Sequence, residues 1–357
     1  MPSKPQFVGE KVKLGAIVRA SSERNKGGRC DLVYSVTNSQ GFIPSEEYFS
    51  KEVFSKDLNT YRIVKRDMIA YNPSRINVGS VALQDKNDEV VVSPLYVVFS
   101  VDESKVAPGY VVRFLKSKPG LDQIAFQSIG TVRNNLKYKA LCQMELTLPS
   151  LSVQRDRLAN FVSIESQISQ SRKAIEQLDQ LVKSRFVEMF GDPISNSKQL
   201  DVKPGSALFK IGNGKSKPIS ERYRDGIPAY GGNGISWYSK ECLINNPTIV
   251  IGRVGRHCGN TRLVNEPCWV TDNAMYIKQF LNDYLDLIYL DELMRLVGFN
   301  RYADKGDLWK ITQQPFMDFA YPMPSIEEQR DFAAFVAQVD KSRFAGQLSA
   351  LRLTRYG

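Results

Sequence analysis

The stretch QRDRLANFVSIESQISQSRKAIEQLDQLVKSRFVEMFGDP, residues 154–193, decides the fold and contains no glycine or proline before Gly191. Its apolar side chains recur at steps of three, four and seven residues, which is the spacing of a coiled-coil seam. Such a helix spans about 57 Å. It ends at Gly191 because glycine favours a left-handed cap and Pro193 cannot continue a helix. The predicted seam consists of Phe161, Ile164, Ile168, Ile175, Leu178 and Val182.

The start of this helix is repeated later in the chain. The sequence PSLSVQRD at 149–156 returns as PSIEEQRD at 324–331, with six of eight positions identical or similar, and a second amphipathic segment follows. A boundary repeated before each helix indicates two copies of one unit. Because a helix with one apolar stripe needs a partner, we expect the two helices to pack antiparallel. The residues KSR at 341–343 interrupt the second stripe, which predicts a shorter helix that frays at its end.

The duplication predicts an α/β protein with a pseudo-two-fold internal repeat. The predicted segments are a mixed α/β domain at 1–150, a spacer helix at 151–190, a second α/β domain at 191–325 and a second spacer helix at 326–357. Runs rich in β-branched and aromatic residues predict strands at 61–64, 68–71, 90–92, 95–101, 248–253 and 275–280. Shorter helices are expected at 108–116 and 283–297. The segments before the repeated boundaries align without gaps, with Leu136 opposite Ile311 and Leu141 opposite Phe316.

The composition favours a polyanionic partner and excludes several other classes of protein. A net charge of +10 over 357 residues is typical of nucleic-acid binding, although a merely basic protein is the alternative. A single histidine, His257, rules out a site built from several histidines, and we expect no metal site. Five cysteines without a CxxC pair indicate reduced thiols in the cytoplasm. The sequence predicts neither a signal peptide nor a membrane span.

Segments of the sequence resemble two enzyme motifs but lack residues that those motifs require. The segment FKIGNGKS at 209–216 has phenylalanine where a phosphate-binding loop requires its first glycine. The strings YNPS at 71–74 and NNPT at 245–248 lack the second proline and the aromatic residue of the adenine methyltransferase tetrapeptide. We therefore expect no catalytic residue in this chain.

Polar loops rich in arginine, lysine and asparagine lie between the predicted strands of both domains. Arginine and lysine neutralise phosphates, while arginine and asparagine can bind guanine and adenine edges through two hydrogen bonds. Solvated surface loops are the alternative interpretation. The candidate DNA contacts are Arg24, Asn25, Lys26, Arg29, Arg75, Arg133, Asn134, Lys215, Lys217, Arg222, Arg224, Tyr230, Asn233, Arg253 and Arg256.

Three stretches carry a resemblance to a known family. They are the PS…QRD boundary before each helix, KSRFVEMFGDP at 183–193, and GIPAYGGNGI at 226–235. With them the chain resembles the specificity (S) subunits of type I restriction–modification systems, and the duplicated order covers its whole length. The resemblance implies two target-recognition domains joined by two long antiparallel coiled-coil helices. Each domain would read one half of a split target in double-stranded DNA.

The resemblance also implies partners that composition does not reveal. Two modification subunits would dock on the chain and methylate adenine, and restriction subunits can join them. S-adenosylmethionine, ATP and Mg²⁺ would then belong to partner subunits, and this chain would bind no cofactor. The alternatives are a specificity subunit whose modification and cleavage activities share one partner chain, a stand-alone DNA methyltransferase or nuclease, and an adaptor that binds only proteins.

Overall fold

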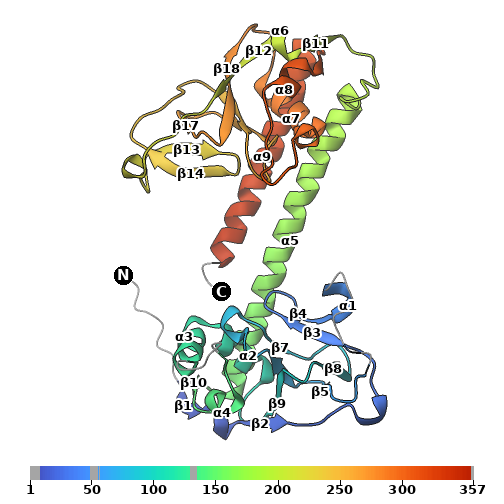
Figure 1. Ribbon diagram of the computed structural model, residues 1–357, viewed down its shortest axis with the longest axis vertical. Helices are drawn as coiled ribbons and strands as arrows, with labels where there is room; N and C mark the ends of the chain where they lie inside the picture. Colours follow the sequence, from blue (N-terminus) through green and yellow to red (C-terminus); the bar gives the residue numbers. More distant parts are fainter. Residues whose placement is uncertain (1–8, 49–54, 56, 129–134, 355–357) are drawn as a thin grey trace. The chain divides into compact units, whose positions relative to one another are not determined.

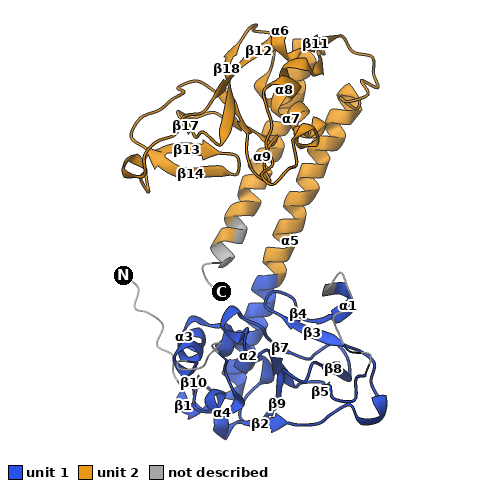
Figure 2. Ribbon diagram, in the orientation of Figure 1, with its two compact units in different colours: residues 1–165 blue, residues 166–357 orange. Residues whose placement is uncertain are grey.

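The computed structural model describes residues 9–48, 55, 57–128 and 135–354, and the chain divides into two compact units (Figure 2). Unit 1 comprises Met1–Glu165 and unit 2 comprises Ser166–Gly357. Each unit combines helices with small sheets, so the fold is mixed α/β. The long helix α5 (Leu151–Phe190) begins in unit 1 and ends in unit 2, and the long helix α9 (Ile326–Thr354) belongs to unit 2.

Unit 1 contains a four-stranded antiparallel sheet with the strand order β2-β9-β6-β7. Its strands are β2 (Val18–Ser21), β9 (Val97–Val101), β6 (Ile69–Tyr71) and β7 (Val81–Leu83). Valine, isoleucine and aromatic residues recur in them because these side chains fit a pleated, half-buried surface. Tyr71 and Phe99 are completely buried and share a core with Val111 and Leu115 of helix α2 (Pro108–Lys116).

Paired strands and short helices complete the described part of unit 1. The antiparallel pairs are β1 (Glu10–Lys13) with β10 (Glu145–Leu148), β3 (Tyr34–Thr37) with β4 (Gly41–Pro44), and β5 (Arg62–Lys65) with β8 (Glu89–Val92). The remaining helices are α1 (Ser45–Tyr48), α3 (Lys118–Gln127), α4 (Tyr138–Leu141), and the 3-10 turns η1 (Leu14–Ala16), η2 (Lys26–Gly28) and η3 (Ile76–Val78).

Unit 2 contains a four-stranded sheet with the equivalent order, β12-β18-β15-β16, also antiparallel throughout. Its strands are β12 (Phe209–Asn213), β18 (Ala274–Phe280), β15 (Thr248–Gly252) and β16 (Thr261–Val264). A second sheet has the order β14-β13-β17, from β14 (Gly234–Ser239), β13 (Ile227–Gly231) and β17 (Trp269–Val270), and β11 (Val202–Pro204) pairs with β19 (Ala320–Pro322). The helices are α6 (Gly205–Leu208), α7 (Leu287–Val297), α8 (Gln314–Asp318), η4 (Ile219–Glu221) and η5 (Phe299–Tyr302).

Equivalent backbone hydrogen bonds recur in the two units. The amide of Leu136 donates to the Pro73 carbonyl oxygen at 3.0 Å, and the amide of Ile311 donates to the Arg253 carbonyl oxygen at 3.0 Å. Each bond fastens the segment before a repeated boundary to the loop that follows β6 or β15. The aligned residues are all buried, namely Leu136, Ile311, Leu141 and Phe316.

The glutamine of the first QRD motif fastens the start of α5 to unit 1. Gln154 is completely buried. Its Oε1 accepts a hydrogen bond from the Ala107 amide at 2.9 Å, and its Nε2 donates to the carbonyl oxygens of Lys105 at 3.1 Å and Pro149 at 2.8 Å. The amide therefore joins the first turn of α5 to the loop that precedes α2.

The glutamine of the second motif makes the same contacts in unit 2. Gln329 is also completely buried, and its Oε1 accepts from the Asp286 amide at 2.9 Å. Its Nε2 donates to the carbonyl oxygens of Tyr284 at 3.3 Å and Pro324 at 3.0 Å. The start of α9 is thus joined to the loop that precedes α7, as α5 is joined to the loop before α2.

Within unit 2, α9 runs beside the C-terminal half of α5 in the opposite direction (Figure 1). The contacts pass from Phe186 with Phe332, through Asp179 with Arg343, to Ile175 with Gly346. Residue numbers fall along α5 as they rise along α9, so the packing is antiparallel. Phe186 and Phe190, which lie outside the predicted seam, are only 1% exposed. Phe186 stacks on Tyr289, and the other ring contacts of the two phenylalanines with Tyr289 and Phe332 are edge-to-face.

Within unit 1, the first half of α5 packs on α2. Nη1 and Nη2 of Arg113 each donate to the Glu165 carboxylate at 2.6 Å, and the guanidinium lies 5.1 Å from the ring centre of Phe161. Hydrogen bonding to Arg113 lowers the pKa of Glu165. Every predicted seam position is buried or half-buried, while the positions that separate them are exposed except for the half-buried Ser171.

One expectation about the helices needs correction. Helix α7 begins at Leu287 and not at residue 283, because Asp286 Oδ1 caps it by accepting from the amides of Ile288 at 2.8 Å and Tyr289 at 3.1 Å. Helix α9 is shorter than α5, as expected, and it continues through residues 341–343, where Arg343 pairs with Asp179 and Asp340. Residues 355–357 of the predicted second helix lie outside the described residues. In the described ranges no helix is both long and apolar enough to span a bilayer.

Candidate nucleic-acid interface

One end of the β12-β18-β15-β16 sheet gathers polar loops from across unit 2. Strand β12 ends at Asn213 opposite Met275, and β15 ends at Gly252 opposite Ala274, so their following loops leave from the same edge. We define the loop edge of unit 2 as residues 213–215, 231–234, 252–260, 271–273 and 304–313.

Backbone hydrogen bonds hold these loops to one another. The donor–acceptor pairs are Gly214 to Ala274 at 3.0 Å, Arg253 to Asn273 at 2.9 Å, Gly255 to Trp309 at 2.8 Å and Ile311 to Arg253 at 3.0 Å. Glycine is required where the backbones meet, because a Cβ at Gly214 would collide with the Thr271 carbonyl oxygen. The loop edge is therefore a fixed surface rather than a set of independent loops.

Exposed side chains on the loop edge of unit 2 can contact phosphates and bases. Arg253, Arg256 and Lys215 are exposed, as is Asn233 in the turn between β13 and β14. The backbone of Lys215 is fixed on both sides, since its amide donates to Val270 at 2.8 Å and its carbonyl oxygen accepts from Trp269 Nε1 at 2.8 Å. The loop edge carries five cations, Lys215, Arg253, Arg256, Lys305 and Lys310, against the carboxylates of Asp272, Asp304 and Asp307.

Two predicted DNA contacts in unit 2 need correction, because their side chains are largely buried and make their contacts inside the protein. The side chain of Lys217 is 9% exposed, with its Nζ 3.1 Å from both Glu221 and Glu241 and 4.3 Å from the ring centre of Trp269. Tyr230 is 7% exposed and donates its hydroxyl to Glu266 at 2.8 Å. Burial raises the pKa of Tyr230, so the hydroxyl stays protonated.

Arg222 and Arg224 lie beside this cluster and are exposed. The Nε and Nη2 atoms of Arg222 donate to the Lys217 carbonyl oxygen at 3.0 and 2.8 Å, and its guanidinium lies 5.5 Å from the ring centre of Trp237. These bonds use one side of the guanidinium. Arg224 remains a predicted phosphate contact.

The equivalent end of the β2-β9-β6-β7 sheet defines the loop edge of unit 1, residues 22–30, 72–80 and 93–96. Strand β2 ends at Ser21 opposite Val98, and β6 ends at Tyr71 opposite Val97. The exposed cations here include Arg24, Lys26 and Arg75. Arg24 Nη1 donates to the Thr60 carbonyl oxygen at 2.8 Å, which fixes the direction of its side chain.

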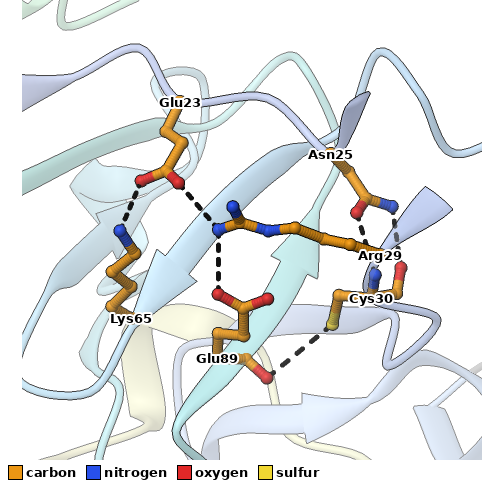
Figure 3. A network of polar contacts seen from close by, with 6 residues as sticks. All are labelled: Glu23, Asn25, Arg29, Cys30, Lys65 and Glu89. Carbon is orange, nitrogen blue, oxygen red and sulfur yellow. Dashed lines mark hydrogen bonds and ion pairs between the residues drawn. The ribbon is translucent and has the colours of Figure 1, made fainter. Parts of the chain in front are cut away.

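Arg29 lies in a network of ion pairs (Figure 3). Its Nη2 is 2.7 Å from Glu23 Oε1 and 2.9 Å from Glu89 Oε2, while Lys65 Nζ is 2.8 Å from Glu23 Oε2. Hydrogen bonds from Lys65 and then Arg29 lower the pKa of Glu23, and the bond to Glu23 raises the pKa of Arg29. The network balances the charge of Arg29, which makes it a weaker candidate for a phosphate than Lys26.

Asn25 is buried and cannot reach a base, which corrects its predicted role (Figure 3). Its Nδ2 donates to the Cys30 carbonyl oxygen at 2.7 Å, and its Oδ1 accepts from the Cys30 amide at 3.0 Å. The side chain closes the 25–30 loop in the way a backbone pair would. Arg133 and Asn134 lie outside the described residues.

The reasoning from sequence missed the segment 304–310 on the loop edge of unit 2. This segment carries Lys305, Leu308 and Lys310, and Leu308 is 62% exposed. The sequence signal that could have found it is the gap-free alignment of Leu136 with Ile311. In that alignment residues 304–310 correspond to the polar segment that precedes Leu136. Among the described residues, no group of three or more histidine, cysteine, aspartate or glutamate side chains is arranged to hold a metal ion.

Comparison with known proteins gives matches of one kind. No protein-family model matches the chain. A curated relative, the EcoprrI type I restriction enzyme specificity subunit from Escherichia coli, is 27% identical over 113 residues, which is 32% of this chain and 28% of that protein. The aligned part thus spans less than a third of either protein.

Solved structures match over nearly the whole chain. The S subunit of a type I restriction–modification system from M. genitalium has a TM-score of 0.62 at 14% identity, covering 100% of this chain and 96% of its own. A structure concerned with complex assembly and conformational transition of the type I R-M system has a TM-score of 0.50 at 16% identity, covering 99% and 97%. At these identities the likeness establishes the fold. The resemblance to type I specificity subunits that the sequence motifs indicate is confirmed.

Proposed function

We propose that this chain is the DNA sequence-recognition subunit of a type I restriction–modification complex, with one half of a bipartite target read by each unit. One observation carries the proposal: two sheets of identical strand order present basic, asparagine-containing loops at the same edge. A chain with two equivalent DNA-contacting edges is suited to a target that has two separate parts. The curated relative and the solved structures support this reading.

The mechanism is recognition without catalysis. Each loop edge enters a major groove, where cations fix the register on phosphates and asparagine and arginine contact base edges. Each good two-bond contact discriminates between bases by about 1–3 kcal/mol. The two long helices pair as an antiparallel coiled coil and fix the gap between half-sites. If both halves are read from one face, their centres lie about 34 Å apart.

Partners supply the chemistry in this proposal. Two modification subunits dock on the chain and methylate adenine with S-adenosylmethionine, and restriction subunits that use ATP and Mg²⁺ can join them. The chain itself binds no cofactor and acts in the cytoplasm. A system in which modification and cleavage share one partner chain would use the same recognition subunit.

The experiment is selection from random duplex DNA by the full chain in complex with its modification subunits. We expect a split sequence with a gap fixed to within one base pair. Binding that weakens steeply with salt is also expected, because cations that contact phosphates release counterions. Recovery of no sequence, or of a single continuous one, would contradict the proposal.

Two rivals give different results in the same assays. A stand-alone methyltransferase or nuclease would modify or cut DNA when S-adenosylmethionine or Mg²⁺ is added to the purified chain. An adaptor that binds only proteins would be indifferent to DNA both alone and with its partners.

A further inference from the structure

Leu308 is an exposed apolar side chain on a cationic surface. It is 62% exposed and lies on the loop edge of unit 2. Single exposed leucines are common on proteins and need no explanation by themselves. Two features separate Leu308 from them, namely the bonds that close its hairpin and the cations on both sides of it.

The hairpin that carries Leu308 is closed at its base by several bonds. The amides and carbonyl oxygens of Asp304 and Lys310 bond reciprocally at 2.9 and 3.0 Å. Lys310 Nζ lies 3.4 Å from Asp304 Oδ2, and Asp304 Oδ1 accepts from the Gly306 amide at 3.2 Å. The carboxylate of Asp304 is therefore used within the hairpin, and these bonds fix the base from which the tip projects.

The same hairpin is fastened to the predicted phosphate contacts. The Gly255 amide donates to the Trp309 carbonyl oxygen at 2.8 Å, and the Ile311 amide donates to the Arg253 carbonyl oxygen at 3.0 Å. Lys305 Nζ lies 5.1 Å from the ring centre of Trp309. Leu308 thus sits on a backbone framework shared with Arg253 and Arg256.

The tip has the chemistry of a groove rather than of a phosphate contact. Asp307, next to Leu308, is exposed, and phosphates would repel its carboxylate. Base edges offer donors to a carboxylate, and the major groove, about 12 Å wide, admits a two-stranded ribbon. The one apolar group on those edges is the C5-methyl group of thymine.

We propose that Leu308 is a specificity-determining residue that packs against a thymine methyl group in the half-site read by unit 2. This inference rests on the proposed DNA-reading function. Burying one methyl group against Leu308 favours thymine over uracil, which lacks it, by roughly four-fold in affinity.

The test replaces each thymine of the selected duplex by uracil, one position at a time. The full chain, with its modification subunits, is compared with Leu308→Ala. The half-site of unit 2 is identified as the half that changes when residues 201–324 are exchanged for those of a relative. At one thymine in that half we expect roughly four-fold weaker binding by the wild type after replacement, and no difference for Leu308→Ala.

Two controls keep the outcome specific. Leu308→Met retains an apolar side chain of similar volume and is expected to keep a preference for thymine. Leu281→Ala removes an exposed leucine just beyond Phe280, where β18 ends away from the loop edge, and should leave the preference unchanged. Thermal unfolding checks that each variant is folded.

Three results would overturn the inference about Leu308. These are a half-site without thymine, a thymine preference that survives Leu308→Ala, and a loss of affinity in that variant that is equal for thymine and uracil. The last result would indicate a wedge between base pairs. Failure of the wild type to select any DNA sequence would instead contradict the proposed function itself.

Discussion

Asn25 and Asn233 look alike in the sequence, since both are asparagines close to glycines in segments between predicted strands. The structure separates them, because Asn25 is buried against Cys30 while Asn233 is exposed in a tight turn. The same holds for Lys217, whose charge is enclosed by two glutamates, and for the exposed Arg253. Residue type indicates what a side chain can bind, but its nearest partners follow only from the fold. The candidate site could therefore be predicted as a set of loops and not residue by residue.

Replacing Asn25 with alanine should destabilise unit 1 without a direct effect on base selection. The change removes two hydrogen bonds and leaves the buried Cys30 backbone groups unpaired, which costs about 1–3 kcal/mol. Chemical denaturation measures the loss. Asn233→Ala is the matched control: it should keep the stability and change the base preference or affinity. Equal stability of the two variants would contradict the assignment of Asn25.

Arg253→Ala and Arg256→Ala should each weaken binding to all DNA sequences in similar proportion, if the side chain contacts a phosphate. A plot of log affinity against log salt concentration has a negative slope, and each lost phosphate contact makes it less steep by about 0.9. A salt titration of affinity on the selected duplex measures the slope. Lys210→Ala removes an exposed cation from the opposite end of β12 and should leave the slope unchanged.

Elements with a strong local pattern could be predicted, and elements that depend on distant contacts could not. Helices α5 and α2 have the expected bounds, because uninterrupted periodicity and terminal proline or glycine act locally. The start of α7 was misplaced because one capping carboxylate, Asp286, decides it. The hairpin 304–310 was missed because it is held by backbone bonds between Asp304 and Lys310 and by bonds to the loop after β15.

Gln154→Leu and Gln329→Leu should each cost several kcal/mol of stability in their own unit. Each substitution keeps the volume approximately but leaves one part-buried backbone amide and two carbonyl groups without their partner, and a lost partner costs about 1–3 kcal/mol where the group is buried. We expect the two losses to be similar, as measured by denaturation. Gln338→Leu, at an exposed position of α9, is the control. A large loss for one glutamine and none for the other would contradict their equivalence.

Ile168→Pro should break α5 at its middle, where proline removes a hydrogen bond and clashes with the preceding turn at a cost of about 3 kcal/mol or more. We expect the variant to bind single half-sites but to lose its preference for one fixed gap. Selections on duplexes with gaps of different length measure this preference. Ile168→Ala, which keeps the helix, is the control. An unchanged gap preference in the proline variant would refute the role of the helix as a spacer.

At the scale of the whole chain, duplication is the feature that the sequence reveals best. The two QRD boundaries are separated by 175 residues, from Pro149 to Pro324. In the structure the two copies have the same strand order and the same buried glutamine. Each also has an equivalent backbone hydrogen bond, donated by Leu136 in one copy and by Ile311 in the other. Strand order itself could not be predicted, because short strands of similar composition pair according to the whole sheet. The two-part target remains the central claim.

The most direct measurement of that claim is the DNA sequence selected before and after exchange of residues 201–324 for the equivalent segment of a relative with a different target. Both chains are assembled with the same modification subunits and offered the same random duplex library. We expect one half of the recovered sequence to change while the other half and the gap are retained. Change in both halves, or a continuous sequence from either chain, would contradict it.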